Sequence, residues 1–103
     1  MKNKTSKLRK IEQSRYSIIT DNLDTCYLCG QAKHHLHEVF FGNNRINSMK
    51  YGCIVPLCAT CHTKVHNDIQ LDLKLKKHLE TAFIEVYRCD TDYFIKIFHK
   101  NYL

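Results

Sequence analysis

No run of apolar residues in this sequence approaches the ~18 residues that a membrane-spanning helix needs, which excludes a chain that crosses a bilayer by helices. The N-terminal stretch is polar and basic with no apolar segment behind it, so we find no secretory signal and expect an intracellular protein. Internal repeats and low-complexity tracts are absent too. A chain of 103 residues is long enough for one domain but not for two. We therefore expect one small folded domain with no membrane partner.

Acidic residues are fewer than basic ones, since 10 Asp/Glu stand against 16 Lys/Arg and give a formal net charge of +6. Residues 1–25 contain six basic and three acidic residues, residues 26–66 contain four and one, and residues 67–103 contain six of each. All of the net positive charge thus lies in the first two-thirds of the chain. This charge favours an anionic partner such as nucleic acid, bound through its phosphates.

Composition divides the chain into a basic N-terminal arm at 1–24, a core at 25–68 and C-terminal helices at 69–103. The last segment carries an apolar stripe with the spacing of an amphipathic helix, which predicts packing against the core. The stripe consists of Leu71, Leu75, Leu79, Ala82, Phe83, Val86 and Tyr87. Residues 88–91 interrupt it, and Asp90 or Thr91 is a candidate cap for a second helix.

The middle segment predicts two short strands and a helix, and hence an α+β domain. Residues 36–41 read as a strand, residues 42–44 as a turn and residues 51–57 as a second strand. A helix is expected to begin around residues 58–61. The aromatic side chains of Phe40, Phe41 and Tyr51 are expected in the core rather than in contact with bases.

Two Cys-x-x-Cys pairs, separated by 28 residues, are the most specific feature of the sequence. In a chain without a secretory signal such pairs favour metal ligands over disulfides, and two of them complete a closed tetrahedral zinc shell. The predicted ligands of this structural Zn²⁺ are Cys26, Cys29, Cys58 and Cys61. A redox role is a minor alternative because no thioredoxin-like βαβ pattern surrounds either pair. Cys53 and Cys89 are expected to be small buried residues, although Cys53 lies close enough to Cys58 to exchange with it as a ligand.

Five of the seven histidines lie between residues 34 and 66, and a zinc held by four cysteines leaves them without a role. His62 follows Cys61 directly, and His66 shares its helical face, which suits one metal ion or one phosphate. His34, His35 and His37 lie on or just before the first predicted strand. A zinc between the two cysteine pairs is expected to draw this strand and that helix together.

This order of motifs resembles the HNH endonucleases with a zinc-stabilised ββα-metal core: Cys-x-x-Cys, a histidine-containing strand, a Gly/Asn loop and Leu-Cys-x-x-Cys-His. More narrowly, HLHEVFFGNNRINSMKYGCIVPLCATCHTKVHND and the ending FIKIFHKNYL resemble small HNH-type proteins of bacterial phages and prophages. The resemblance implies a treble-clef-like α+β core with C-terminal helices, DNA as the partner and a cytoplasmic location in a bacterial or phage-infected cell. It also implies a catalytic divalent cation, Mg²⁺ or Mn²⁺, besides the structural zinc.

The resemblance further implies the roles of single residues. A strand histidine acts as general base on the attacking water, and the cation neutralises charge at the scissile phosphate. The histidine after the last zinc cysteine holds the metal, which corresponds to His62, with His66 as a second candidate. A loop asparagine orients the base. Asn44 is preferred here over Asn43 and Asn47.

Two alignments of the strand remain open. In one, His34 is a metal ligand and His35 is the base. In the other, His37 is the ligand and Glu38 stands where the base histidine belongs, which departs from the family pattern. A variant of the second makes His37 the base and Glu38 a ligand. We expect His37 to be essential, with Glu38 and His35 in supporting roles.

The leading hypothesis is therefore a metal-dependent DNA endonuclease of low sequence specificity. Candidate phosphate contacts are Arg15, Arg45, Lys50 and Lys64, which would position the duplex without reading its sequence. One alternative is a zinc-containing nucleic-acid-binding module without catalysis, which the Glu38 departure and the basic arm favour. A protein-interaction adaptor in a phage complex is the third possibility.

Overall fold

The computed structural model describes residues 6–103, so the first five residues of the predicted basic arm lie outside it. It is a small α+β structure, as expected, with helices around a two-stranded antiparallel sheet. The strands are β1 (His35–Glu38) and β2 (Ile54–Leu57), and their register places His37 opposite Val55.

Strand β1 ends at Glu38, three residues earlier than predicted, because the chain turns there onto a helix that the sequence pattern did not indicate. A short 3-10 helix, η1 (Gly42–Asn44), leads into α2 (Arg45–Lys50). The N–H of Phe40 donates to Ser48 Oγ on α2 at 3.1 Å, which replaces a strand partner. Phe40 is buried as expected, whereas Phe41 is 45% exposed, so its prediction as a core residue is wrong.

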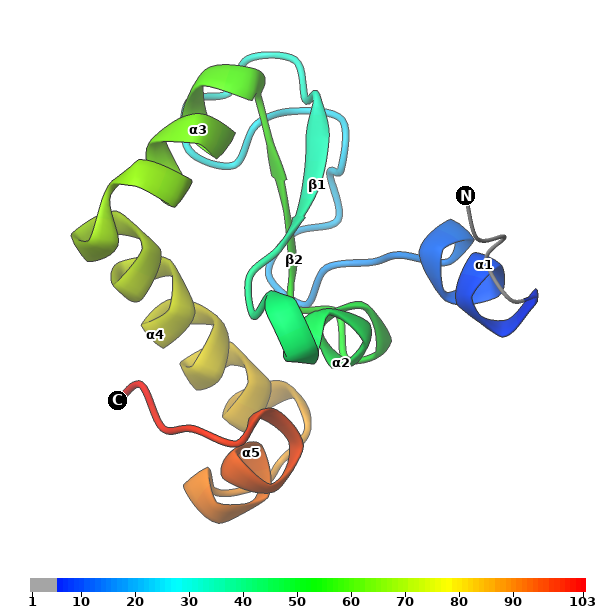
Figure 1. Cartoon of the computed structure of the whole chain (residues 1–103), viewed down its shortest axis with the longest axis vertical. Helices are drawn as coiled ribbons and strands as arrows, with labels where there is room; N and C mark the ends of the chain where they lie inside the picture. Colours follow the sequence, from blue (N-terminus) through cyan, green and yellow to red (C-terminus); the bar gives the residue numbers. More distant parts are fainter. Residues whose placement is uncertain (1–5) are drawn as a thin grey trace.

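Three helices follow the sheet: α3 (Ala59–Asn67), α4 (Ile69–Val86) and α5 (Thr91–Phe98). The predicted interruption after α4 is confirmed, and the carboxylate of Asp90 caps α5 by accepting the N–H of Tyr93 at 2.9 Å. Helices α3 and α4 lie on one side of the strands and α1 (Ser6–Gln13) lies on the other (Figure 1). No helix in residues 6–103 has the length and apolar character to cross a membrane.

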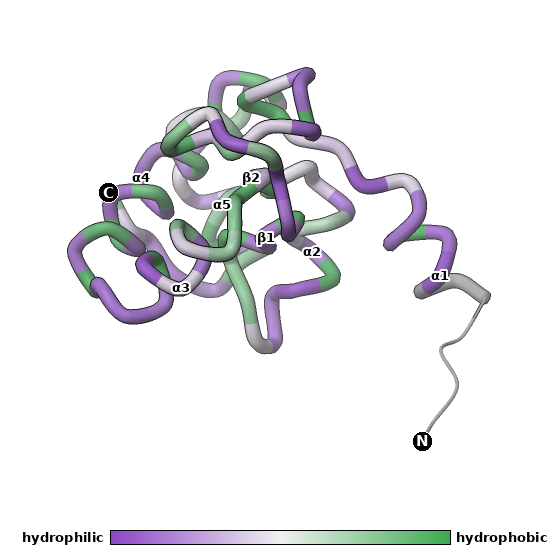
Figure 2. The backbone as a smooth tube through the Cα atoms, turned by 90° about the horizontal axis from the view of Figure 1, so that it is seen from above, coloured by the Kyte–Doolittle hydropathy of each residue, from purple (hydrophilic) through white to green (hydrophobic). Residues whose placement is uncertain are grey.

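One apolar core joins the sheet to the C-terminal helices. The predicted stripe on α4 buries Leu75, Leu79 and Phe83, although Val86 is exposed. The Phe40 ring, next to β1, packs 5.3 Å from the Phe94 ring on α5. Figure 2 shows hydrophobic backbone segments near β2 and α5 in the middle of the molecule, with α1 set apart from them.

The segment after α1 is fixed to the core at a glycine. Ile18 N–H donates to the carbonyl of Gly52 at 2.9 Å, and Tyr16 Oη donates to the carbonyl of Lys50 at 2.8 Å. Gly52 has φ +73°, where a side chain is strained, and a Cβ there would meet the Tyr16 ring and lie 2.9 Å from Ile18 Cγ2. The part of the predicted arm that the structure describes is therefore anchored to the domain.

Candidate metal centre

The two cysteine pairs come together from a tight turn and from the start of α3. In the turn, Gly30 adopts φ +80° and its N–H donates to the carbonyl of Cys26 at 2.8 Å. The N–H of Tyr27 donates to the carbonyl of Pro56 at 2.8 Å, which ties this turn to β2. At the other pair, Cys58 caps α3, because its sulfur accepts the N–H of Cys61 at 3.4 Å.

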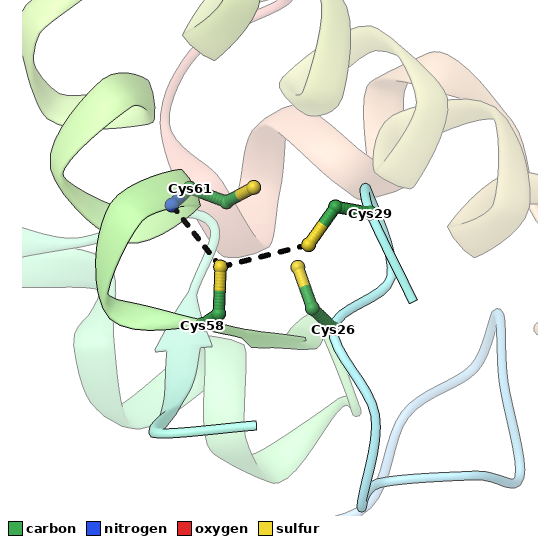
Figure 3. Close-up of side chains that lie close together, drawn as sticks. All are labelled: Cys26, Cys29, Cys58 and Cys61. Carbon is green, nitrogen blue, oxygen red and sulfur yellow. Dashed lines mark hydrogen bonds between the residues drawn. The ribbon is translucent and has the colours of Figure 1, made fainter. Parts of the chain in front are cut away.

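The four sulfur atoms converge on one point, as Figure 3 shows. All four lie within 4.8 Å of one another, and Sγ of Cys29 is 3.6 Å from Sγ of Cys58. A tetrahedral zinc shell with bonds of about 2.3 Å places its sulfurs about 3.8 Å apart. The predicted cluster of Cys26, Cys29, Cys58 and Cys61 is thus confirmed as a group of side chains that fits a zinc ion. Cys53 is buried elsewhere in the core and takes no part.

The electrostatics of the cluster also suit a cation. Burial raises the pKa of Cys26, but hydrogen bonds with the backbone of Cys58, Cys29 and Leu28 outweigh it and lower the pKa to about 6. Burial, and then hydrogen bonds with neighbouring cysteines, raise the pKa of Cys61 to about 12. One thiolate therefore forms readily, whereas a full set of thiolates needs the positive charge of a bound metal.

A second cluster consists of His37 on β1 with His62 and His66 on α3. Their candidate ligand nitrogens all lie within 4.8 Å of one another. The ring of His37 is 5.1 Å from that of His62 and 5.2 Å from that of His66. The Nε2 atoms of His62 and His66 are 3.1 Å apart. The i, i+4 spacing of His62 and His66 on α3 thus places both of their imidazoles next to the imidazole of His37 on β1.

His37 has the properties of a ligand rather than of a surface histidine. It is 3% exposed, and its buried Nε2 has no hydrogen-bond partner among residues 6–103. Desolvation, followed by the positive charges of His62, His66 and Lys76, lowers its pKa to about 3. The imidazole is therefore neutral at pH 7, and its buried Nε2 is left without a hydrogen-bond partner in the described chain. An orphaned nitrogen beside two further imidazoles fits a divalent cation.

The other two strand histidines occupy different positions. The ring of His35 is exposed and lies 4.5 Å from that of His62, at the edge of the cluster. His34 accepts the N–H of Ala59 on Nδ1 at 3.2 Å and so helps to cap α3. The structure brings His35 to the cluster and places His34 at the start of the helix.

The carboxylate of Glu38 forms ion pairs with two arginines. Successive strand residues alternate between faces, so Glu38 points away from the face that His37 presents to α3. Its Oε1 accepts from Nε of Arg45 at 2.8 Å and lies 4.0 Å from Nη2 of Arg15. Glu12 on α1 completes this arginine–glutamate ring, because its Oε2 lies 3.1 Å from Arg15 and 3.3 Å from Arg45. Two predicted phosphate contacts are therefore engaged in ion pairs within the chain.

The loop asparagines hold helices together. Asn44 Nδ2 donates to the carbonyl of Phe98 at 3.0 Å, and Asn47 Nδ2 donates to the carbonyl of Ile97 at 3.1 Å. Both bonds attach the loop and α2 to α5, and Asn43 is exposed. The hydrogen bond of the Asn44 amide thus goes to the C-terminal helix.

The remaining predicted phosphate contacts are exposed lysines. Lys64 lies on α3 between His62 and His66, two residues from each, and Lys50 ends α2. Lys50 and Lys10 of α1 line a cavity of about 340 Å³, together with Ile11, Ile46 and Asn47. Neither predicted lysine contacts the histidine cluster. Sequence reasoning treated α4 as packing only and overlooked Asp72 and Lys76, whose i, i+4 spacing was visible.

Comparisons with protein-family models, with curated proteins and with solved structures found no match for this chain.

Proposed function

We propose that this protein is a metal-dependent endonuclease of the HNH type that hydrolyses phosphodiester bonds in DNA. The observation that carries the proposal is the pairing of two clusters on one short helix. Helix α3 supplies Cys61 to the cysteine cluster and, at the next position, His62 to the histidine cluster. If the protein needed zinc only for stability, it would not require a second cluster of three imidazoles, one of which has a buried nitrogen without a partner.

In this proposal the four cysteines hold a structural zinc. The metal would fasten the turn before β1 to the start of α3, and so fix the distance between His37 on the strand and His62 on the helix. Structural zinc sites contribute about 10–16 kcal/mol in apparent binding energy, which exceeds the usual stability of a small domain. Folding, and with it the geometry of the second cluster, should therefore depend on the first metal.

The histidine cluster supplies the catalytic site. A cation held by His37, His62 and His66 would neutralise the charge that develops on the scissile phosphate. Three imidazole ligands favour Zn²⁺, Ni²⁺, Co²⁺ or Cu²⁺ over Mg²⁺, which prefers oxygen ligands. The donor set therefore points to a later first-row divalent metal such as Co²⁺, Ni²⁺ or Zn²⁺, whereas the family resemblance implied Mg²⁺ or Mn²⁺.

We assign the general base to His35. It lies on the same face of β1 as His37, its ring is exposed, and it adjoins His62, so it can accept a proton from water at the edge of the cluster. Glu38 is a weaker candidate because its carboxylate is bonded to Arg45 on the other face. In this assignment the ion pair between Arg45 and Glu38 helps to hold β1 in position and takes no part in the reaction.

The test is nicking of supercoiled plasmid by zinc-loaded protein with Mg²⁺, Mn²⁺, Co²⁺ or Ni²⁺. Wild type should nick, His37→Ala should be inactive, and His35→Ala should lose roughly 10²–10⁴-fold in rate, the usual contribution of a general base. His99→Asn is the matched control, because His99 is an exposed histidine after α5 that lies outside both clusters, and asparagine tolerates its left-handed backbone. If the wild-type protein leaves DNA intact with every one of these metals, the proposal is refuted.

A nucleic-acid-binding module without catalysis is the second candidate. The ion pairs of Glu38 favour it, because the position that the resemblance assigns to a base holds a carboxylate bound to arginine. This alternative predicts salt-sensitive DNA binding that survives both His37→Ala and His62→Ala, together with no nicking.

A further inference from the structure

One lysine of α4 is held in a slot beside the histidine cluster. Nζ of Lys76 lies 2.8 Å from Oδ2 of Asp72, 4.3 Å from the centre of the Phe41 ring and 5.5 Å from that of the Tyr102 ring. The side chain of Lys76 is 14% exposed. Lysine is seldom so covered unless it is paired, and here a carboxylate and two aromatic faces stabilise the ammonium.

The slot is built from distant parts of the chain. Phe41 follows β1, and Tyr102 belongs to the C-terminal tail, which runs back along α4 (Figure 1). The tail is fixed because the N–H of Tyr102 donates to the buried carboxylate of Glu80 at 2.7 Å. The Tyr102 ring also packs 5.4 Å from the ring of Phe40. The position of the ammonium is therefore set by the whole fold.

Phe41 connects the slot to the histidine cluster. Its ring centre lies 5.6 Å from that of His66 and 6.2 Å from that of His37, while Lys76 stands over the same ring. The lysine is thus an electrostatic neighbour of the cluster without being a ligand.

An ammonium in this position does not help the protein to hold a cation, since like charges repel. It does favour an anion that lies between the ammonium and a cation held by the histidines. The ammonium has three N–H donors, and Asp72 Oδ2 is its one ion-pair partner among the described residues. We infer that Lys76 binds a phosphate oxygen of the nucleic acid at the histidine cluster, with Asp72 and Tyr102 as positioning residues, an inference that rests on the proposed function.

This role predicts opposite effects on two ligands. Lys76→Met keeps an unbranched stem between Phe41 and Tyr102 but removes the charge. Affinity for a short DNA duplex should fall roughly 10- to 100-fold, the value of one charge-assisted hydrogen bond. Affinity of the histidine cluster for Co²⁺ should stay constant or rise by roughly two- to tenfold, because a repulsion is removed. A lysine that served packing alone would weaken both or neither.

The experiment measures both affinities on zinc-loaded full-length protein: duplex binding by fluorescence anisotropy without added second metal, and Co²⁺ binding by absorption. Lys77→Met is the matched control, since Lys77 is the exposed neighbour of Lys76 on α4. Lys76→Arg should recover much of the DNA affinity. The inference is supported if Lys76→Met alone loses DNA affinity and keeps Co²⁺ affinity.

It is overturned if Lys76→Met binds DNA within about twofold of Lys77→Met, or if it loses Co²⁺ affinity as well. Nicking by the same proteins separates the two proposals. If the wild type nicks DNA and Lys76→Met and Lys77→Met are equally active, the endonuclease proposal is supported and the role of Lys76 is refuted. If DNA binding depends on Lys76 but no metal supports nicking, the endonuclease proposal is refuted and the phosphate contact of Lys76 is supported. Absence of both binding and nicking removes both.

Discussion

Replacement of His37 by phenylalanine should make the protein less sensitive to acid. His37 is buried and neutral, with its pKa lowered to about 3, whereas an unfolded histidine titrates near 6.5. Because the folded pKa is depressed, the stabilising contribution of this group is fully present above the unfolded pKa and is lost as the pH falls toward the folded one. His37→Phe retains an aromatic ring beside Phe41 but cannot bind the proton.

The size of the effect follows from proton linkage. Between pH 7.5 and 5.5 the unfolded histidine becomes protonated while folded His37 does not, which costs about 1.4 kcal/mol of unfolding free energy. The wild type should lose this amount relative to His37→Phe over that interval, in addition to any loss that both proteins share.

Urea unfolding of zinc-loaded protein, without added second metal, measures this difference at several pH values. His99→Asn provides the control, because it removes an exposed histidine that lies outside both clusters. If wild type and His37→Phe change in parallel between pH 7.5 and 5.5, His37 is not held neutral and the argument for an orphaned ligand nitrogen is lost.

Three further perturbations test the fold around the clusters. Gly52→Ala should cost about 1–3 kcal/mol in urea unfolding, because the backbone is left-handed and the new methyl group meets a tyrosine ring. Glu12→Gln should weaken the attachment of α1, lowering the thermal midpoint and increasing proteolysis at the N-terminal segment, because two arginines lose a shared carboxylate. Removal of zinc by a chelator, or Cys61→Ser, should abolish the cooperative unfolding transition.

Each of these has a control in the chain. Gly30→Ala has a similar backbone strain at φ +80° but no atom within 4 Å of the new methyl group, so it should cost less than Gly52→Ala. Glu85→Gln removes an exposed carboxylate and should leave proteolysis unchanged. Cys89→Ser lies outside the cysteine cluster and should retain zinc-dependent folding. Equal losses within any of these pairs would contradict the local explanation.

The cysteine cluster and the outline of α3 to α5 could be predicted because their signals are local. A Cys-x-x-Cys pair needs only a turn, and the leucine spacing of α4 and the cap at Asp90 lie within a few residues of the structure they determine. The approach of His37 to His62 was also foreseen, since a metal between the cysteine pairs draws the strand and helix together.

Contacts between distant segments had no such signal. Helix α2 is short, and Phe41 reads as a strand residue although the strand ends before it. The arginine–glutamate ring joins Glu12 to Arg45, 33 positions away, and no pattern in the sequence marks that pairing. Glu38 could therefore be named as a departure from the family pattern, but its attachment to Arg45 became visible only in the structure.

Titration of the metal-free reduced protein with Co²⁺ tests the central claim, that α3 joins two distinct metal centres. We predict two separable sites: a tight one with the intense thiolate charge-transfer absorption of four cysteines, and a weaker one with the visible bands of nitrogen ligands. His37→Ala should remove only the second site, and Cys61→Ser should disrupt both, because the histidine geometry depends on the first metal. A single thiolate site that is identical in wild type and His37→Ala would contradict the account.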